Sequence, residues 1–317
     1  MRVCLLGQGE LGQAVAHLAP HAMGELVAQL CDVPPAPWVQ VAPSLEAALF
    51  GAQIVVLCAN ADELAALCEA YAPFAKGDDC VVVAARGARA HFELPHETVR
   101  SLTCVRKLGI LGGPLHTQEF DSERHATVVL ATRFREIVAK VSDIVPRDRV
   151  TIEPIEDLVG LGVGGAYGHI SSILTGLAQG AGLSDTARGL LIGHSMMEAR
   201  CLGIAMGGLP ETFQGIVGWG ELIPRSESRS DRHEQLGQDL AQGLTLDAAR
   251  QKAHLPLEGI QTARVAVEKA HALEVEVPVA RALSEIFDLP SPAEGLSSRL
   301  EALLKRPFNQ PGRTTRA

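Results

Sequence analysis

Short runs of apolar residues recur through the first 150 residues and alternate with helical patterns. Continuous apolar or β-branched runs of this length predict strands that are buried on both faces, as in a parallel sheet covered by helices. The predicted strands span residues 2–6, 25–31, 54–58, 80–84, 108–111, 126–130 and 149–154. Residues 44–50 and 61–71 are predicted to be helical, with Ser44 and Asp62 as N-caps. We therefore expect an α/β domain with a doubly wound sheet.

From about residue 157 the pattern changes, and the sequence predicts one helix after another. The predicted helices span residues 158–182, 185–206, 210–217, 231–242, 245–252, 258–273, 278–287 and 292–304. We expect a Rossmann-type dinucleotide-binding domain over residues 1–153 and an all-helical substrate and dimerisation domain over residues 154–306. The polar tail, residues 307–317, contains Pro and Gly and is expected to be disordered.

The bulk composition narrows the class of protein. Apolar residues make up 47% of the 317 residues, charged residues 21%, and the net charge is −9. This acidity argues against nucleic acid or an anionic membrane as the main partner. No apolar run approaches the roughly 20 residues of a membrane span. The seven cysteines form no Cys-x-x-Cys pair. We therefore expect a cytoplasmic protein with reduced cysteines, no membrane span and no metal site.

The first strand leads directly into a Gly-x-Gly-x-x-Gly turn, Gly7-Gln8-Gly9-Glu10-Leu11-Gly12, that opens a helix. Gly7 permits the tight turn, Gly9 lets a pyrophosphate approach bare backbone, and Gly12 lets the helix pack closely on the strand. Asp32 stands 20 residues after Gly12 and is placed to accept from a ribose 2′-hydroxyl. The motif predicts a nicotinamide or flavin dinucleotide; the alternative is an ordinary turn in a non-binding domain. Asp32 favours NAD over NADP, because a 2′-phosphate would meet its carboxylate.

The helical half contains more specific segments. These are residues 203–215 (GIAMGGLPETFQG), 218–222 (GWGEL), 164–166 (GGA), 236–237 with 242–243, and 258–263 (EGIQTA). In the first domain, Gly113-Pro114 with Glu119 belongs to the same set. Together they resemble the NAD(P)-dependent glycerol-3-phosphate dehydrogenases, in the family's order from residue 1 to about residue 305. The resemblance implies hydride transfer between a nicotinamide and the secondary alcohol or ketone of a small anionic, phosphorylated substrate. It also implies a homodimer, which relatives often form.

The resemblance breaks where the chemistry is expected. Arg86 stands before Gly87 where the family has a lysine in a Lys-Gly turn. After the Gly-Gly-Ala segment, Gly168 replaces a second, catalytic lysine, and His169 replaces an asparagine that faces the substrate in relatives. Glu221 takes the place of an aspartate. We interpret these changes as a rebuilt site.

The segment that grips the substrate phosphate in the family, Ser-Arg-Asn, keeps only Arg232, flanked here by Asp231 and His233. A nearby family threonine becomes Arg225. We expect Arg232 and Arg225 to bind the anionic substrate, because a guanidinium matches phosphate with a bidentate fork. The alternative is a solvated loop whose surface ion pairs contribute little.

The proton chemistry needs a replacement for the lysines. His169 is the natural general acid and base, because imidazole titrates near neutral pH. His116, in the loop after Gly113-Pro114, is a second candidate beside the substrate. Arg86 can hold and polarise but cannot shuttle protons, and Glu221 keeps the family's carboxylate one methylene further out. Asn60 and Glu258 complete the expected cofactor-binding residues.

Two classes of function stay open on the sequence alone. The first is a diverged dehydrogenase in which His169 is the acid and base. The second is a pseudoenzyme that keeps dinucleotide binding for a sensing or scaffolding role. The intact glycines and Asp32 favour cofactor binding in both classes. The loss of both lysines favours the pseudoenzyme, or a changed reaction, over the ordinary family activity.

Overall fold

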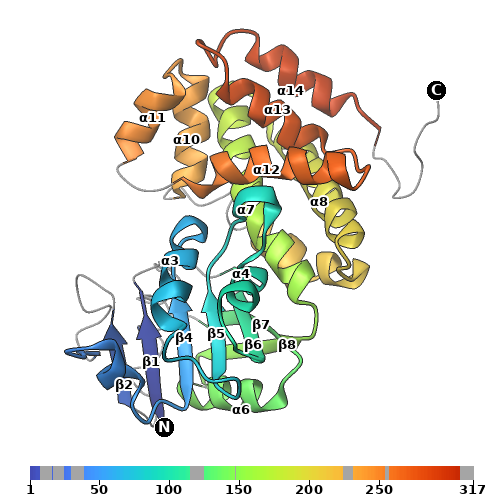
Figure 1. Ribbon diagram of the computed structural model, residues 1–317. Coiled ribbons are helices and arrows are strands. Elements are labelled where there is room, and N and C mark those ends of the chain that lie inside the picture. The colour runs from blue at the N-terminus through green and yellow to red at the C-terminus, as the bar shows by residue number, and fades with distance from the viewer. Residues whose placement is uncertain are drawn as a thin grey trace. The chain divides into compact units, whose positions relative to one another are not determined.

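The computed structural model describes residues 1–7, 16, 25–29, 39–114, 125–146, 148–223, 231–253 and 257–307. The chain divides into two compact units. The first consists of Met1–Ala88 with Glu93–Gly162, and the second of Arg89–Phe92 with Val163–Ala317. Figure 1 shows strands with flanking helices in the first unit and helices in the second. The predicted tail, from residue 308 onward, lies outside the described residues.

The first unit is built on an eight-stranded sheet with the order β3-β2-β1-β4-β5-β6-β7-β8. Its strands are β1 (Arg2–Leu6), β2 (Glu25–Gln29), β3 (Gln40–Val41), β4 (Ile54–Cys58), β5 (Cys80–Ala84), β6 (Lys107–Gly112), β7 (Ala126–Thr132) and β8 (Val150–Ile155). β1 pairs in parallel with both β2 and β4, so the strand order reverses at β1. This reversal is the switch point of a doubly wound fold. The predicted fold class is confirmed.

Two features of the sheet differ from the prediction. β7 pairs antiparallel to β6, and β8 pairs in parallel with β7, so the last two strands run against the others. A run such as residues 126–130 has the same apolar character in either direction, because burial on both faces sets the composition and strand direction does not. The short strand β3 had no predicted counterpart.

Helices cover both faces of the sheet. They are α2 (Leu45–Leu49), α3 (Ala61–Tyr71), α4 (Pro95–Leu102) and α6 (Arg135–Ile144). Alternate residues of β1 enter two separate apolar cores: Val3 lies in the core that contains Ile137 of α6, and Cys4 in the core that contains Leu64 of α3. The sequence prediction missed α4 and α6. Asp62 was also wrong as an N-cap, because α3 has Asn60 there and Asp62 lies in its first turn.

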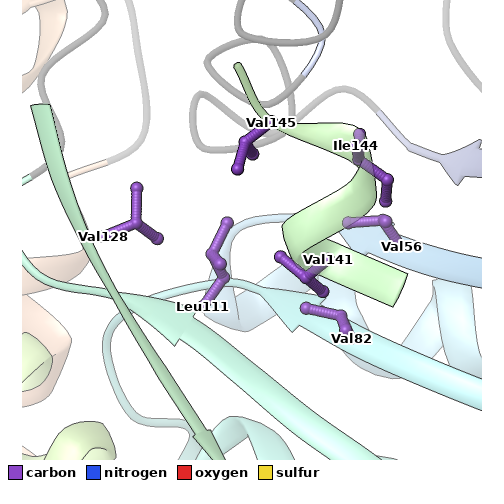
Figure 2. A pocket seen from close by; sticks show the side chains of 7 residues that line it. All are labelled: Val56, Val82, Leu111, Val128, Val141, Ile144 and Val145. Carbon is purple, nitrogen blue, oxygen red and sulfur yellow. The ribbon is translucent and has the colours of Figure 1, made fainter. Parts of the chain in front are cut away.

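A small cavity of about 20 Å³ lies in the core beneath α6 (Figure 2). Its lining consists only of apolar side chains: Val56, Val82, Leu111, Val128, Val141, Ile144 and Val145. A cavity of this size has room for about one water molecule, and nothing in its lining would hydrogen-bond to it. It is therefore a packing defect and not a ligand site.

The second unit is helical. Its helices are most of α7 (Leu158–Gly180), α8 (Asp185–Ala205), α10 (Arg232–Ala241), α11 (Leu246–Ala253), α12 (Glu258–Ala272), α13 (Pro278–Phe287) and α14 (Leu296–Leu304), with the 3-10 turn η1 (Ala90–Phe92) packed against α12. The helix predicted over residues 210–217 is instead a 3-10 turn, Pro210–Gln214, followed by a π-turn, Ile216–Gly220. The helix predicted from residue 292 begins at Leu296.

Helix α7 packs against α10 with almost no space between their backbones. A Cβ at Gly176 would overlap the backbone carbonyl of Glu234, and a Cβ at Gly237 would overlap that of Ile173. The sequence indicated no run of membrane-spanning length, yet α7 is long and apolar enough to cross a membrane by length and composition. However, 89% of its apolar window is buried inside the fold, which is typical of a core helix.

Candidate active site

The imidazole rings of His169 and His233 stack on each other in the helical unit. Their centroids lie 4.3 Å apart and the ring planes differ by 14°. His169 comes from α7 and His233 from the first turn of α10, and the exposed fractions of the two residues are only 4% and 5%. The close approach of α7 and α10 brings together two aromatic side chains that are far apart in the sequence.

Each imidazole has a carboxylate beyond it. Nε2 of His169 lies 4.0 Å from Oε2 of Glu258, the first residue of α12. Nδ1 of His233 lies 3.9 Å from Oδ1 of Asp231. The backbone N–H of Gly259 donates to Nε2 of His233 at 3.1 Å. A Cβ at Gly259 would press on both histidines, so glycine allows α12 to approach the pair.

The start of α10 also carries the residue expected to bind phosphate. Arg232 is the first residue of α10 and is half-buried. Asp231 is the N-cap, and its Oδ1 accepts the backbone N–H of His233 at 2.8 Å and of Glu234 at 3.1 Å. Burial, together with the nearby Asp231 carboxylate, raises the pKa of Glu234 to about 7. Glu221, which follows the π-turn, is fully buried in the same unit.

In the first unit, Gly7 forms the turn that follows β1. Its φ is +91°, and a Cβ there would overlap the carbonyl oxygen of Cys58 at the end of β4. Only glycine fits this position, which lies at the carboxyl edge where the strand order reverses. Asn60 follows β4 and makes no side-chain capping bond to α3. A bare glycine turn at the switch point fits a bound dinucleotide.

Arg86 follows β5 in the first unit. Its Nη2 donates to the carbonyl oxygen of Gly113 at 2.5 Å and so ties the end of β5 to the turn after β6. The remaining predicted site residues lie outside the described residues; they are Gln8, Gly9, Glu10, Leu11, Gly12, Asp32, His116 and Arg225. Among the described residues, no three His, Cys, Asp or Glu side chains are grouped to hold a metal ion.

The structure thus brings together His169 and Glu258, for which the sequence predicted different roles. It adds His233, which the sequence marked only as a neighbour of Arg232. The sequence carried a usable signal: His169 and His233 each stand where the family they resemble has an asparagine.

A glycine turn at the switch point of a doubly wound sheet, followed by a helical domain, is typical of the two-domain NAD(P)-dependent oxidoreductases. The family model described as "NAD-dependent glycerol-3-phosphate dehydrogenase C-terminus" matches residues 157–295. A glycerol-3-phosphate dehydrogenase [NAD(P)+] of Moorella thermoacetica is 30% identical over 265 residues, which cover 83% of this chain and 78% of the relative. The chain therefore belongs to the glycerol-3-phosphate dehydrogenase [NAD(P)+] family.

A further relative carries the same family name, and two solved structures share the fold. The glycerol-3-phosphate dehydrogenase [NAD(P)+] 2 of Salinibacter ruber is 27% identical over 81% of this chain and 76% of the relative. The solved glycerol-3-phosphate dehydrogenase of Coxiella burnetii matches the fold with a TM-score of 0.88 at 19% identity, over 96% of this chain and 99% of that one. A ketopantoate reductase from Ralstonia eutropha gives a TM-score of only 0.59 at 16% identity, over 96% and 99% of the two chains.

Proposed function

We propose that this protein interconverts glycerol 3-phosphate, or a closely related phosphorylated alcohol, and the corresponding ketone with NAD as the cofactor. The observation that carries this proposal is the buried pairing of His169 with Glu258, at 4.0 Å. When bound, the nicotinamide supplies or accepts the hydride. The protein must then supply a proton donor and acceptor, a substrate anchor and a dry site.

His169 is the proposed acid and base. In the direction of ketone reduction, its imidazolium gives a proton to the carbonyl oxygen, and in the reverse direction the neutral ring takes the hydroxyl proton. Glu258 faces Nε2 and stabilises the imidazolium, as a carboxylate does beside a catalytic histidine. Arg232 binds the substrate phosphate with charge-assisted hydrogen bonds, and Arg225 and His116 assist it. Glu221 and Arg86 complete the proposed site.

The cofactor would be held mainly by the predicted dinucleotide-binding domain, residues 1–153. Gly7 and the residues of the turn after it, from Gln8 to Gly12, would receive the pyrophosphate. Asp32 would bind the ribose hydroxyls and favour NAD. Asn60 and Glu258 would make further contacts with the cofactor. The overlap that a Cβ at Gly7 would make with Cys58 supports this assignment.

We also propose that the site has diverged from that of the relatives, with Gly168 in place of the catalytic lysine. The surroundings of the chain's lysines support this. Lys107 and Lys140 bind Glu136, at 2.7 Å and 2.8 Å, and Lys252 binds Asp239 at 2.7 Å. These three amines are engaged in ion pairs remote in sequence from His169.

We further propose a cytoplasmic homodimer. Large apolar side chains are exposed on the helical unit, and they would give a second copy a surface to bury. They are Leu190, Leu209, Trp219 and Ile223. Sedimentation analysis would test this proposal, because a monomer at all concentrations would contradict it.

The activity is tested by titrating the protein with NADH and NADPH by fluorescence and then following NADH oxidation with dihydroxyacetone phosphate. We expect tighter binding of NADH than of NADPH, and turnover. His169→Asn should lower kcat by about 10²- to 10⁴-fold. The matched control is His271→Asn, an exposed residue at the end of α12. Binding without turnover of any phosphorylated hydroxyketone would contradict this function and support the pseudoenzyme alternative.

A further inference from the structure

We propose that His233 is a positioning residue that holds the imidazole of His169 in a single orientation and a single tautomer. This inference rests on the proposed role of His169 as acid and base. The observations that carry it are the stacked rings, the hydrogen bond from Gly259 to His233, and the carboxylate beyond each ring.

The hydrogen bond to His233 defines which of its nitrogens carries the proton. Nε2 accepts the N–H of Gly259 at 3.1 Å, so it must present a lone pair. In the neutral ring the proton therefore lies on Nδ1, the atom that faces Asp231. A second proton on Nε2 would place two N–H donors against each other in a buried site. His233 therefore stays neutral while the site works.

His169 has a contact of the opposite kind. Its Nε2 faces the carboxylate of Glu258, which favours a proton on that atom in both the neutral and the charged ring. Of the two rings, His169 is therefore the one that takes up a second proton and becomes an imidazolium. The neutral ring of His233, stacked at 4.3 Å, restricts rotation of the His169 ring about its Cβ–Cγ bond.

The first two residues of α12 organise both rings. Glu258 faces His169, and the N–H of the next residue, Gly259, binds His233. The position of α12 thus sets the tautomer of His233 directly, and it sets that of His169 as long as the stacked ring of His233 keeps Nε2 facing Glu258. Asp231 keeps its own position as the N-cap of α10, through the N–H groups of His233 and Glu234. The whole arrangement lies within the helical unit, where the starts of α10 and α12 meet the middle of α7.

The test is imidazole ¹H–¹⁵N NMR of the intact protein between about pH 5 and pH 8. His169→Asn and His233→Gln assign the two sets of signals by their loss. In the unmodified protein we expect His233 to show only the Nδ1–H tautomer throughout, and His169 to show one set of signals. A proton on Nε2 of His233 anywhere in this range would overturn the proposal. The tautomer of His233 is read from the unmodified protein, so this measurement does not depend on turnover.

Two variants separate the stacking from the hydrogen bond. His233→Gln keeps an acceptor for the N–H of Gly259 and removes the stacked aromatic ring. The His169 ring can then rotate, so His169 should show mixed tautomers. His233→Phe keeps a stacked aromatic ring and removes the hydrogen-bond acceptor. His169 should therefore keep one tautomer while the protein loses stability. His194→Gln, at another buried histidine of this unit, is the matched control and should leave the His169 signals unchanged. Unchanged His169 signals in folded His233→Gln would overturn the proposal.

Kinetics give an independent readout. His233→Gln should lower kcat by about 10- to 100-fold with an unchanged KM for NADH, because a misplaced acid and base slows the proton step without affecting cofactor binding. If the unmodified protein binds NADH and shows no turnover, the proposed function fails, and the NMR result still decides the role of His233. Equal kcat values in His233→Gln and the His194→Gln control would contradict the positioning role.

Discussion

Glu198 caps the start of α13 from inside the helical unit, since its carboxylate accepts the backbone N–H of Val279 at 2.6 Å. The same carboxylate accepts the N–H of Ala280 at 2.9 Å and the hydroxyl of Tyr167 at 3.0 Å. Burial nevertheless raises the pKa of Glu198 to about 7, since the hydrogen bonds offset only part of the lost hydration. Three helices, α7, α8 and α13, therefore meet at one titratable group.

Glu198 should lower the stability of the protein as the pH rises from about 4.5 to about 7, whereas the buried His96, whose pKa is lowered to about 4, acts in the opposite direction below about pH 6.5. Because the folded pKa of Glu198 is above its unfolded value, the folded state retains a proton in this window that the unfolded state has lost. One such group contributes about 1.4 kcal/mol per pH unit. Glu234, whose pKa is also raised to about 7, adds to the same slope.

Glu198→Gln should remove the share of Glu198, about 1.4 kcal/mol per pH unit, from the dependence of the unfolding free energy on pH, as measured by urea unfolding at a series of pH values. The exposed Glu268→Gln on α12 is the control and should leave the slope as it is. Glu198→Ala should lower the free energy of unfolding by about 2–4 kcal/mol near pH 4.5, because it leaves the N–H groups of Val279 and Ala280 without an acceptor, and by less as the pH rises toward 7. A slope in Glu198→Gln equal to that of the original protein would refute the assignment.

Gly7→Ala should abolish tight NADH binding and lower the free energy of unfolding by roughly 2–4 kcal/mol. Its methyl group would overlap the carbonyl oxygen of Cys58 at a φ of +91°. Gly182→Ala is the matched control, with a φ of +72° and no heavy atom within 4 Å of the new methyl. It carries backbone strain alone and should cost about 1 kcal/mol. Equal losses in the two variants would show that the overlap is relieved by a small shift.

Val128→Ile should stabilise the first unit by about 0.5–1 kcal/mol, since one added methylene enters the cavity shown in Figure 2. The control is Val55→Ile on β4, a buried valine of the opposite core that does not line this cavity. Overpacking there should cost about 1–3 kcal/mol. The measurement is the difference between the urea midpoints of the two variants. A loss of stability in Val128→Ile as large as that in Val55→Ile would show that the cavity cannot accept a methylene group.

Arg232→Ala should raise KM for the phosphorylated ketone by about 10- to 100-fold with a smaller effect on kcat, because the anchor acts in both ground and transition states. Arg264→Ala, which removes an exposed pair with Asp288, is the control. Added inorganic phosphate should inhibit the original protein competitively and the Arg232→Ala variant much less. Phosphate inhibition that is equal in both proteins would place the anchor elsewhere.

The sequence predicted the parallel part of the sheet and most helices of the second unit because each depends on local patterns of apolar residues. The strand reversal at β7 depends on which neighbour the strand meets, and a buried run such as residues 126–130 carries no information about direction. Short helices such as α6 were missed between strongly apolar strands. The helix predicted over residues 210–217 is a 3-10 turn that is followed by the π-turn Ile216–Gly220, because the local pattern does not distinguish these turns from an ordinary helix.

The candidate site shows the same limit. His169 was found because it stands at a position where the related enzymes have a functional residue. Its contact with His233 depends on glycines of α7 and α10, above all Gly176 and Gly237, which let two backbones approach. Such a contact is a property of packing between distant segments, so neither histidine's immediate sequence indicates it.

The short segment Arg89–Phe92 determines where the chain can be divided into its two units. It lies within the N-terminal half of the chain but belongs to the helical unit, where Phe92 is fully buried. His91 and Phe92 both have positive φ, a conformation that isolated peptides avoid. A gene cut after residue 162 would therefore separate the helical unit from one of its own core side chains. The two halves therefore cannot be exchanged independently. A chimera with a relative would fold only if residues 89–92 and the C-terminal half came from the same parent.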